Sequence, residues 1–376
     1  MTTPTGRNDP AETVIIVPQQ RDRSDMPTVM MALPEGHDAD LWEKPAPPEP
    51  LEAPWLRQVA WLAPALLTLV LGGAGAWLGS ASWAPAAATP WATDALRWYL
   101  DLAGDSTLAL RAPSVVAMAA ATAFAAIAGT LTGGLRVAVT AGLLFAVLPT
   151  TSVLARQPGP LALSVMLAAL ATVLLVSLIR KPRVIAGLAY AITIGLLGVT
   201  GGLAAYLMLG AHAVGLTAEV RDRRTPLIWG LAAVAGGGAA TLPMILGHAD
   251  VLAGGRRLSM ASTWLPIDLF GGALLGGAVL ALAFLGLSLR HTLAVLTTWA
   301  MLPVVALAAA AAFLPVWTSQ ELLITVPAWC LVAGVGLRRF TLARGVAVIL
   351  AVALLTVPAQ IDLRRSDQAP AWVVRS

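Results

Sequence analysis

About eleven apolar stretches, each long enough to cross a lipid bilayer, lie between Val59 and Ile361 and are joined by short loops. With 58% hydrophobic residues, 12% charged residues and a mean hydropathy of +0.78, the chain carries too little charge for a soluble globular protein. We therefore predict an all-α, multi-pass protein of the plasma membrane with about eleven transmembrane helices. Because the first stretch follows a long polar segment, it is expected to be an uncleaved signal anchor.

Composition disfavours several classes of function. The net charge of +4 comes from residues at loop ends and not from a basic face with interleaved aromatic residues, so no nucleic-acid partner is expected. Cys330 is the single cysteine, which leaves no internal disulfide. The only lysines, Lys44 and Lys181, do not stand in a Gly-Lys-Ser/Thr phosphate-binding loop, and no cofactor is expected.

Ionisable residues in mid-membrane would indicate a transporter. Every acid and cation of the apolar region is predicted to lie at a helix end or in a loop. The three histidines of this region, His212, His248 and His291, are predicted near loops on different sides of the membrane, so they are not expected to form a metal site.

The loops alternate in charge. One set carries eleven cations and two acids, whereas the other carries eight arginines and eight acids. The positive-inside rule then predicts a cytoplasmic N-terminus and an extracytoplasmic C-terminus. This assignment requires the segment Val184–Leu216 to cross twice, because basic clusters flank both of its ends. We predict two short spans that reverse near Gly198–Gly202.

Three regions are predicted: a disordered cytoplasmic tail over 1–57, a transmembrane domain over 58–361 and an extracytoplasmic tail over 362–376. The first tail holds ten acids, five cations and many prolines. In it, Thr13 and Thr28 each follow an acid and precede aliphatic residues. Phosphorylation there would create an anionic site for an arginine-lined phospho-reader domain. A short repeat with no partner explains the pattern equally well.

The first outer loop is predicted to contain an amphipathic helix over 91–103. Its apolar face would carry two tryptophans, and its polar face would carry Asp94, Arg97 and Asp101. Such a helix is typical of segments that lie on the membrane surface.

Four segments follow one another in a distinctive order: Leu100–Ser114, Ala141–Pro149, Thr263–Pro266 and Leu322–Pro327. This order resembles that of the GT-C membrane glycosyltransferases, in their protein O-mannosyltransferase-like branch, over most of residues 58–361. The resemblance implies transfer of a sugar from a polyprenyl-phosphate carrier to an extracytoplasmic acceptor. An acid would act on the acceptor hydroxyl, and cations would hold the carrier phosphate.

The chain departs from this pattern at the catalytic motifs. No acid lies between Gly79 and Pro90, and the family's Asp-Glu pair does not occur. Gln157 stands where the family has Glu and Gly159 where it has Arg, while Gln320 and Glu321 occupy an Arg-Tyr position. These changes predict a member that is degenerate at its catalytic motifs.

Other outer residues are candidates for the missing roles. Asp94 and Asp268 are candidate catalytic bases, with an ion pair on a solvated face and a helix cap as their structural alternatives. Candidates for the carrier phosphate are Arg156, Arg256 and Arg257, because arginine suits bidentate phosphate contact. Anchoring to lipid headgroups is an equally good explanation of these arginines.

Three functions therefore stay open. The first is a GT-C-like protein related to polyprenyl-phosphate-sugar-dependent glycosyltransferases that binds membrane lipid, including a polyprenyl-phosphate sugar, without catalysis. The second is an active extracytoplasmic glycosyltransferase with Asp94 as base. The third is an unrelated permease, for which inverted repeats and broken helices are typical.

The charge asymmetry leads to a prediction about topology. Reporter fusions at the two ends of the chain should report opposite compartments, with the N-terminus in the cytoplasm, because an odd number of spans and the positive-inside rule require it. The same compartment for both ends would contradict the assignment.

Overall fold

The computed structural model describes residues 54–77, 90–104, 106–219, 222–245, 269–287, 294–314, 317 and 319–365. Regular structure in these ranges is helical, as predicted. The helices are α1 (Pro54–Trp77), α2 (Pro90–Ala103), α3 (Thr107–Gly133), α4 (Leu135–Val147), α5 (Pro149–Arg156), α6 (Leu161–Arg180), α7 (Val184–Gly201), α8 (Leu203–Glu219), α9 (Arg224–Ile245), α11 (Ala273–Leu287), α12 (Ala294–Phe313), α13 (Ser319–Leu322), the 3₁₀ turn η5 (Leu323–Thr325), α14 (Val326–Leu337) and α15 (Leu342–Arg365).

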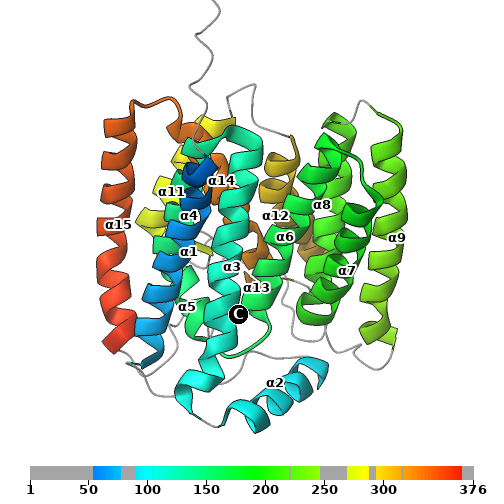
Figure 1. Cartoon of the computed structure of the whole chain (residues 1–376), viewed down its shortest axis with the longest axis horizontal. Helices are drawn as coiled ribbons and strands as arrows, with labels where there is room; N and C mark the ends of the chain where they lie inside the picture. Colours follow the sequence, from blue (N-terminus) through cyan, green and yellow to red (C-terminus); the bar gives the residue numbers. More distant parts are fainter. Residues whose placement is uncertain are drawn as a thin grey trace, which may run out of the picture. The chain divides into compact units, whose positions relative to one another are not determined.

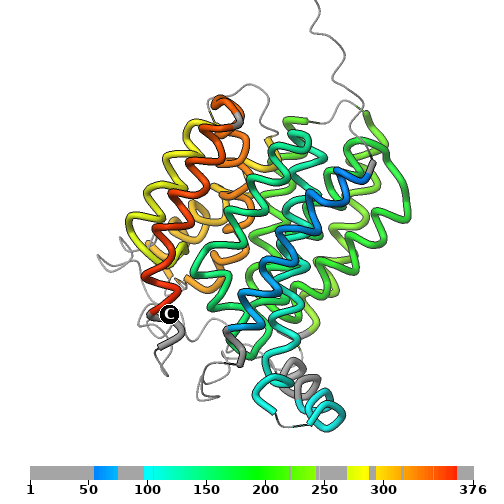
Figure 2. Tube along the Cα trace, turned by 60° about the vertical axis from the view of Figure 1, so that its left-hand side comes forward, coloured from blue at the N-terminus to red at the C-terminus, as the bar shows by residue number. Residues whose placement is uncertain are grey.

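Eight of the described helical segments are long and apolar enough to cross a membrane, and α4 with α5 forms a ninth if the bent pair counts as one span. Two further apolar helices, α8 and α11, are shorter. The multi-pass architecture is thus confirmed, while the number of eleven spans stays a prediction. Figures 1 and 2 show that α1 and α15 both run from one end of the helices to the other. We call the end at which α15 finishes the predicted outer end.

The segment around Gly202 folds as predicted. Helix α7 ends at Gly201, and Gly202 takes a φ of 49°, which glycine adopts without strain. The Tyr190 hydroxyl lies 2.8 Å from Nδ1 of His212. Because these residues lie about ten positions before and after the break, α8 folds back along α7. Two helices, and not one continuous helix, therefore occupy this segment.

One apolar stretch forms a bent pair of helices and not one straight span. Helix α4 ends at Val147 and α5 starts at Pro149, with axes 62° apart. Proline has no backbone N–H and clashes with the preceding turn, so a helix cannot continue unbent through this position, although Pro149 is well placed to begin one. The break redirects the chain, and every residue of α5 is buried.

Helix α2 lies across the predicted outer end of the other helices in both views (Figures 1 and 2). Its bounds agree with the helix predicted in the first outer loop. Trp98 and Leu102, both from the predicted apolar face, are 68% and 70% exposed. An exposed apolar face on a helix outside the bundle suits contact with the lipid interface.

Two glycines allow a close contact between α11 and α14. A Cβ built on Gly336 would overlap the Leu282 carbonyl oxygen, and one on Gly286 would overlap that of Val332. Gly272 and Gly276 have the four-residue spacing that allows close helix approach elsewhere. A Cβ on Gly272 would meet only Leu275 at 3.9 Å, so this glycine makes no close approach. Small residues bring helices together only where the crossing point falls on them.

This contact predicts that a methyl group added at Gly336 destabilises the protein more than one added at a glycine in open space. Gly336→Ala should lower the free energy of unfolding by about 1–3 kcal/mol, because rigid backbone atoms of α11 occupy the space. Gly277→Ala is the matched control on α11, where a Cβ meets nothing within 4 Å. Thermal unfolding in detergent measures both variants, and equal midpoints would contradict the expectation.

Candidate functional site at the predicted outer end

Helix α5 carries Arg156 into the protein interior. Its whole length is buried, and Arg156, its last residue, is only 2% exposed. Three hydrogen bonds attach this part of the chain to its surroundings: Thr150 Oγ1 donates to the Leu269 carbonyl at 2.8 Å, Gln360 Nε2 to Ser152 Oγ at 2.8 Å, and Ser114 Oγ to the Gln157 carbonyl at 2.9 Å. The guanidinium of Arg156 is thus placed by a helix that neighbours hold on several sides.

A second buried arginine lies close by. Helix α3 begins at Thr107, with Ser106 as its cap, and Arg111 follows about one turn later with 1% exposure. Arg111 precedes Ser114 by three positions, so the two share a helix face. Because Ser114 donates to the carbonyl of Gln157, the residue after Arg156, the first turns of α3 pack against the end of α5. We call this contact the outer corner. Sequence reasoning had placed Arg111 in an outer loop and did not select it.

The altered motif segment is built into this corner. Gln157 is the C-cap residue that follows α5; it is buried, and its backbone carbonyl is the acceptor for Ser114. Gly159 has a φ of 149°, a conformation that other residues rarely adopt. An arginine at position 159, as the family segment would have, is therefore incompatible with this backbone without strain.

Glu321, at the other altered motif position, contacts the first turn of α8. It lies in α13, its side chain is half-buried, and its carboxylate accepts a hydrogen bond from the Ala204 backbone N–H in the first turn of α8. A hydrogen-bond acceptor suits this place, because the first turn of a helix presents N–H groups that have no partner within the helix. The other oxygen, Oε2, is buried and has no hydrogen-bond partner among the described residues.

The structure does not describe the side chains of several predicted site residues. Arg256, Arg257, Asp268, Thr13 and Thr28 lie outside the described residues. The backbone of Asp94 lies in α2 at the predicted outer end, whereas its side chain is outside the described part. Whether these groups join Arg156 therefore stays a prediction.

The expectation that no ionisable side chain lies inside the spans is wrong for His212. This residue lies in the interior of α8 and is fully buried. Its Nδ1 faces the Tyr190 hydroxyl at 2.8 Å, and its Nε2 faces Thr172 Oγ1 at 3.2 Å. Sequence reasoning placed it near a loop because α8 was expected to end earlier. Both ring nitrogens have partners, so the group joins α6, α7 and α8 through hydrogen bonds.

The described residues contain no cluster of three or more His, Cys, Asp or Glu side chains that would hold a metal ion. The buried side chains described near the predicted outer end include Arg111 and Arg156. Such a corner suits a phosphorylated lipid better than it suits a cation, because arginine makes bidentate contacts with phosphate oxygens.

Comparison with solved structures agrees with this architecture. The crystal structure of ArnT from Cupriavidus metallidurans bound to undecaprenyl phosphate matches with a TM-score of 0.51 at 15% identity, over 83% of this chain and 72% of that chain. ArnT from the same organism in the apo state matches with a TM-score of 0.54 at 16% identity, over 80% and 62%. This chain has the fold of ArnT. The resemblance to GT-C membrane glycosyltransferases is thereby confirmed at the level of the fold.

No protein-family model matches the chain, and a search of curated proteins finds no match either. The ArnT likeness appears in three dimensions and at very low identity. The arrangement of helices is therefore shared, while the likeness by itself assigns no activity.

The contact between Glu321 and α8 predicts how that position responds to substitution. Glu321→Ala should lower the free energy of unfolding by about 1–3 kcal/mol, because it leaves the Ala204 N–H without its acceptor. Glu321→Gln keeps an acceptor oxygen and should cost less. Thermal unfolding in detergent compares the two, and equal losses would show that the capping hydrogen bond contributes nothing.

Proposed function

We propose that this protein binds a polyprenyl-phosphate lipid at its predicted outer end, with Arg156 and Arg111 as the phosphate site, and that it does not transfer a sugar. The observation that carries the proposal is the burial of both guanidinium groups in a fold shared with an ArnT that was crystallised with undecaprenyl phosphate. The carrier's apolar tail would lie in the membrane beside the spans.

Electrostatics supports an anionic ligand at this corner. A buried cation loses its hydration, and that cost is offset when anionic groups contact it. Arginine also makes bidentate contacts with phosphate oxygens. A phosphate monoester provides several acceptor oxygens, which is enough for charge-assisted hydrogen bonds with both side chains.

The altered motif positions support the absence of transfer. Gln157 is a neutral amide and does not act as a general base, Gly159 has a backbone conformation that disfavours the family's arginine, and Glu321 caps α8. If these positions carry catalytic groups in the family, as the resemblance implies, each change would remove one of them.

An active enzyme is the second candidate. It is favoured by α2, which carries Asp94 across the predicted outer end of the helices, and by Leu269, which follows Asp268 in the chain and accepts a hydrogen bond from Thr150 of α5. In this alternative one of the two acids would take the proton of the acceptor hydroxyl while the arginines hold the leaving phosphate.

Phosphate binding is tested at Arg156. Arg156→Gln should weaken binding of undecaprenyl phosphate by about 10- to 100-fold, the range expected for a hydrogen bond to a charged group. Arg183→Gln, an exposed arginine at the start of α7, is the control that removes the same charge elsewhere. Thermophoresis of the purified full-length chain measures the dissociation constants, and equal values for both variants would contradict the proposed site.

Sugar transfer is tested separately. Purified wild-type protein should show no turnover with polyprenyl-phosphate sugars. If turnover occurs and Asp94→Asn lowers it by about 10²–10⁴-fold without loss of thermal stability, the enzyme alternative replaces our proposal. Because the binding and transfer assays are independent, a failure of either one is recognisable.

A further inference from the structure

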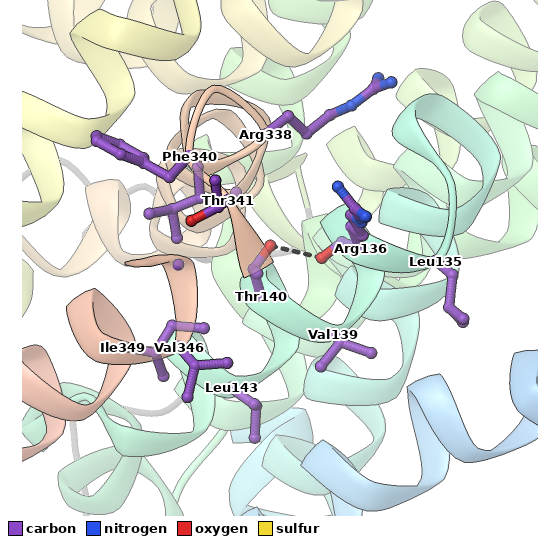
Figure 3. Close-up of a pocket in the computed structure, with 13 residues that line it drawn as sticks. Leu135, Arg136, Val139, Thr140, Leu143, Arg338, Phe340, Thr341, Val346 and Ile349 are labelled. Atoms are coloured by element: carbon purple, nitrogen blue, oxygen red, sulfur yellow. Dashed lines mark hydrogen bonds between the residues drawn. The ribbon is translucent and has the colours of Figure 1, made fainter. Parts of the chain in front are cut away.

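A second site lies at the opposite end of the helices. A pocket with a volume of about 230 Å³ lies where α4 begins, α14 ends and α15 begins. Figure 3 shows Leu135, Val139 and Leu143 of α4 facing Val346 and Ile349 of α15 across it. Thr140 adds little polarity, because its hydroxyl donates to the Arg136 carbonyl at 2.8 Å. The walls are therefore apolar.

Two arginines line the same pocket. Arg136 lies in the first turn of α4 and Arg338 directly follows α14, and both side chains are exposed. In Figure 3 the two side chains extend away from the apolar wall formed by Val346 and Ile349. None of the thirteen residues that line the pocket is acidic, so the positive charge is not offset within it.

We propose that this pocket binds an anionic phospholipid, with one acyl chain inserted between α4 and α15 and the phosphate held by Arg136 and Arg338. The combination of an apolar groove between spans and basic residues at its mouth is complementary to a lipid in both charge and polarity. The pocket volume lies below the range of about 300–1,000 Å³ for sites that enclose a ligand. Only part of an acyl chain fits inside, and the rest would extend into the bilayer.

The position of α15 favours a lipid over a soluble ligand. Val346 lines the pocket and is 47% exposed, and the apolar surface continues along α15 through Leu350 and Leu354, which are 59% and 71% exposed. Helix α15 is long enough to span a membrane, and this apolar face suits contact with lipid tails. A lipid can therefore enter the groove sideways from the bilayer.

This site is separate from the proposed polyprenyl-phosphate site. Within α3, Arg111 lies near the predicted outer end and Gly133 near the opposite end. The 22 residues between them, at 1.5 Å per residue, separate the two ends by about 33 Å. The pocket contains none of the residues assigned to the outer corner. It lies at the end that the charge asymmetry of the loops predicts to be cytoplasmic.

The chain offers two ways to disable the pocket. In the double variant Arg136→Gln/Arg338→Gln the apolar groove stays and the phosphate contacts are lost. In Gly345→Leu the groove is filled, since Gly345 lines the pocket and a Cβ on it would meet nothing within 4 Å. Because Leu is also the better helix former, folding should survive this change.

Each variant has a matched control. Arg183→Gln/Arg224→Gln removes two exposed arginines that do not line the pocket. Gly230→Leu adds the same side chain on α9, where a Cβ likewise meets nothing within 4 Å. Native mass spectrometry of the full-length chain, titrated with phosphatidylglycerol or with phosphatidylcholine, measures lipid binding in all five proteins.

We expect the wild type and both controls to bind phosphatidylglycerol more tightly than phosphatidylcholine. The double arginine variant should lose about 10- to 30-fold in affinity for phosphatidylglycerol, as expected for two arginines that each contribute to anionic-lipid binding. Gly345→Leu should lose affinity for the same lipid. Together these results would support the site.

Other results would overturn the proposal. Equal affinity of the wild type for the two lipids, or pocket variants that bind phosphatidylglycerol as the wild type does, would exclude an anionic-lipid site here. A different occupant, the acidic N-terminal segment of this chain, would be indicated if both pocket variants make residues 1–51 more sensitive to protease while lipid binding is unchanged.

Discussion

The break between α4 and α5 is the constraint on which the predicted outer end depends. Inside a membrane, backbone that leaves the helical hydrogen-bond pattern is tolerated only where protein surrounds it. Pro149 forces the chain out of the α4 axis, and the eight residues of α5 are accordingly all buried. Hydrogen bonds through Ser114, Gln360 and Thr150 hold this segment in place. The position of Arg156 follows from that anchoring.

Charge is used differently at the two ends of the helices. At the predicted outer end the guanidinium groups of Arg111 and Arg156 are withdrawn from solvent, where their interactions with anions are least weakened by water. At the other end Arg136 and Arg338 are exposed beside an apolar pocket. The first arrangement suits selection of one phosphate group in a fixed geometry, and the second suits exchange with lipids of a leaflet.

The main features of the fold could be predicted from local patterns. Apolar length predicted the spans, the glycines at 198–202 with basic flanks predicted the α7–α8 hairpin, and helical periodicity predicted α2. Other features could not, because they depend on neighbours in space. The contact of Gly286 with Gly336 and the hydrogen bonds of His212 both join residues at least 22 positions apart. Arg111 was overlooked for the same reason, since burial of its side chain is visible only once α5 packs against α3.

By itself, the sequence determined that this chain is an all-helical membrane protein, because bilayer thickness, helical period and loop charge act on consecutive residues. Its resemblance to the GT-C enzymes predicted which catalytic motif positions are altered. Only the tertiary structure decided that Gly159 has a backbone conformation that disfavours arginine, that Glu321 caps α8, and that Arg111 and Arg156 are both buried. These are properties of contacts between helices, which form only when the apolar segments pack and exclude both water and lipid.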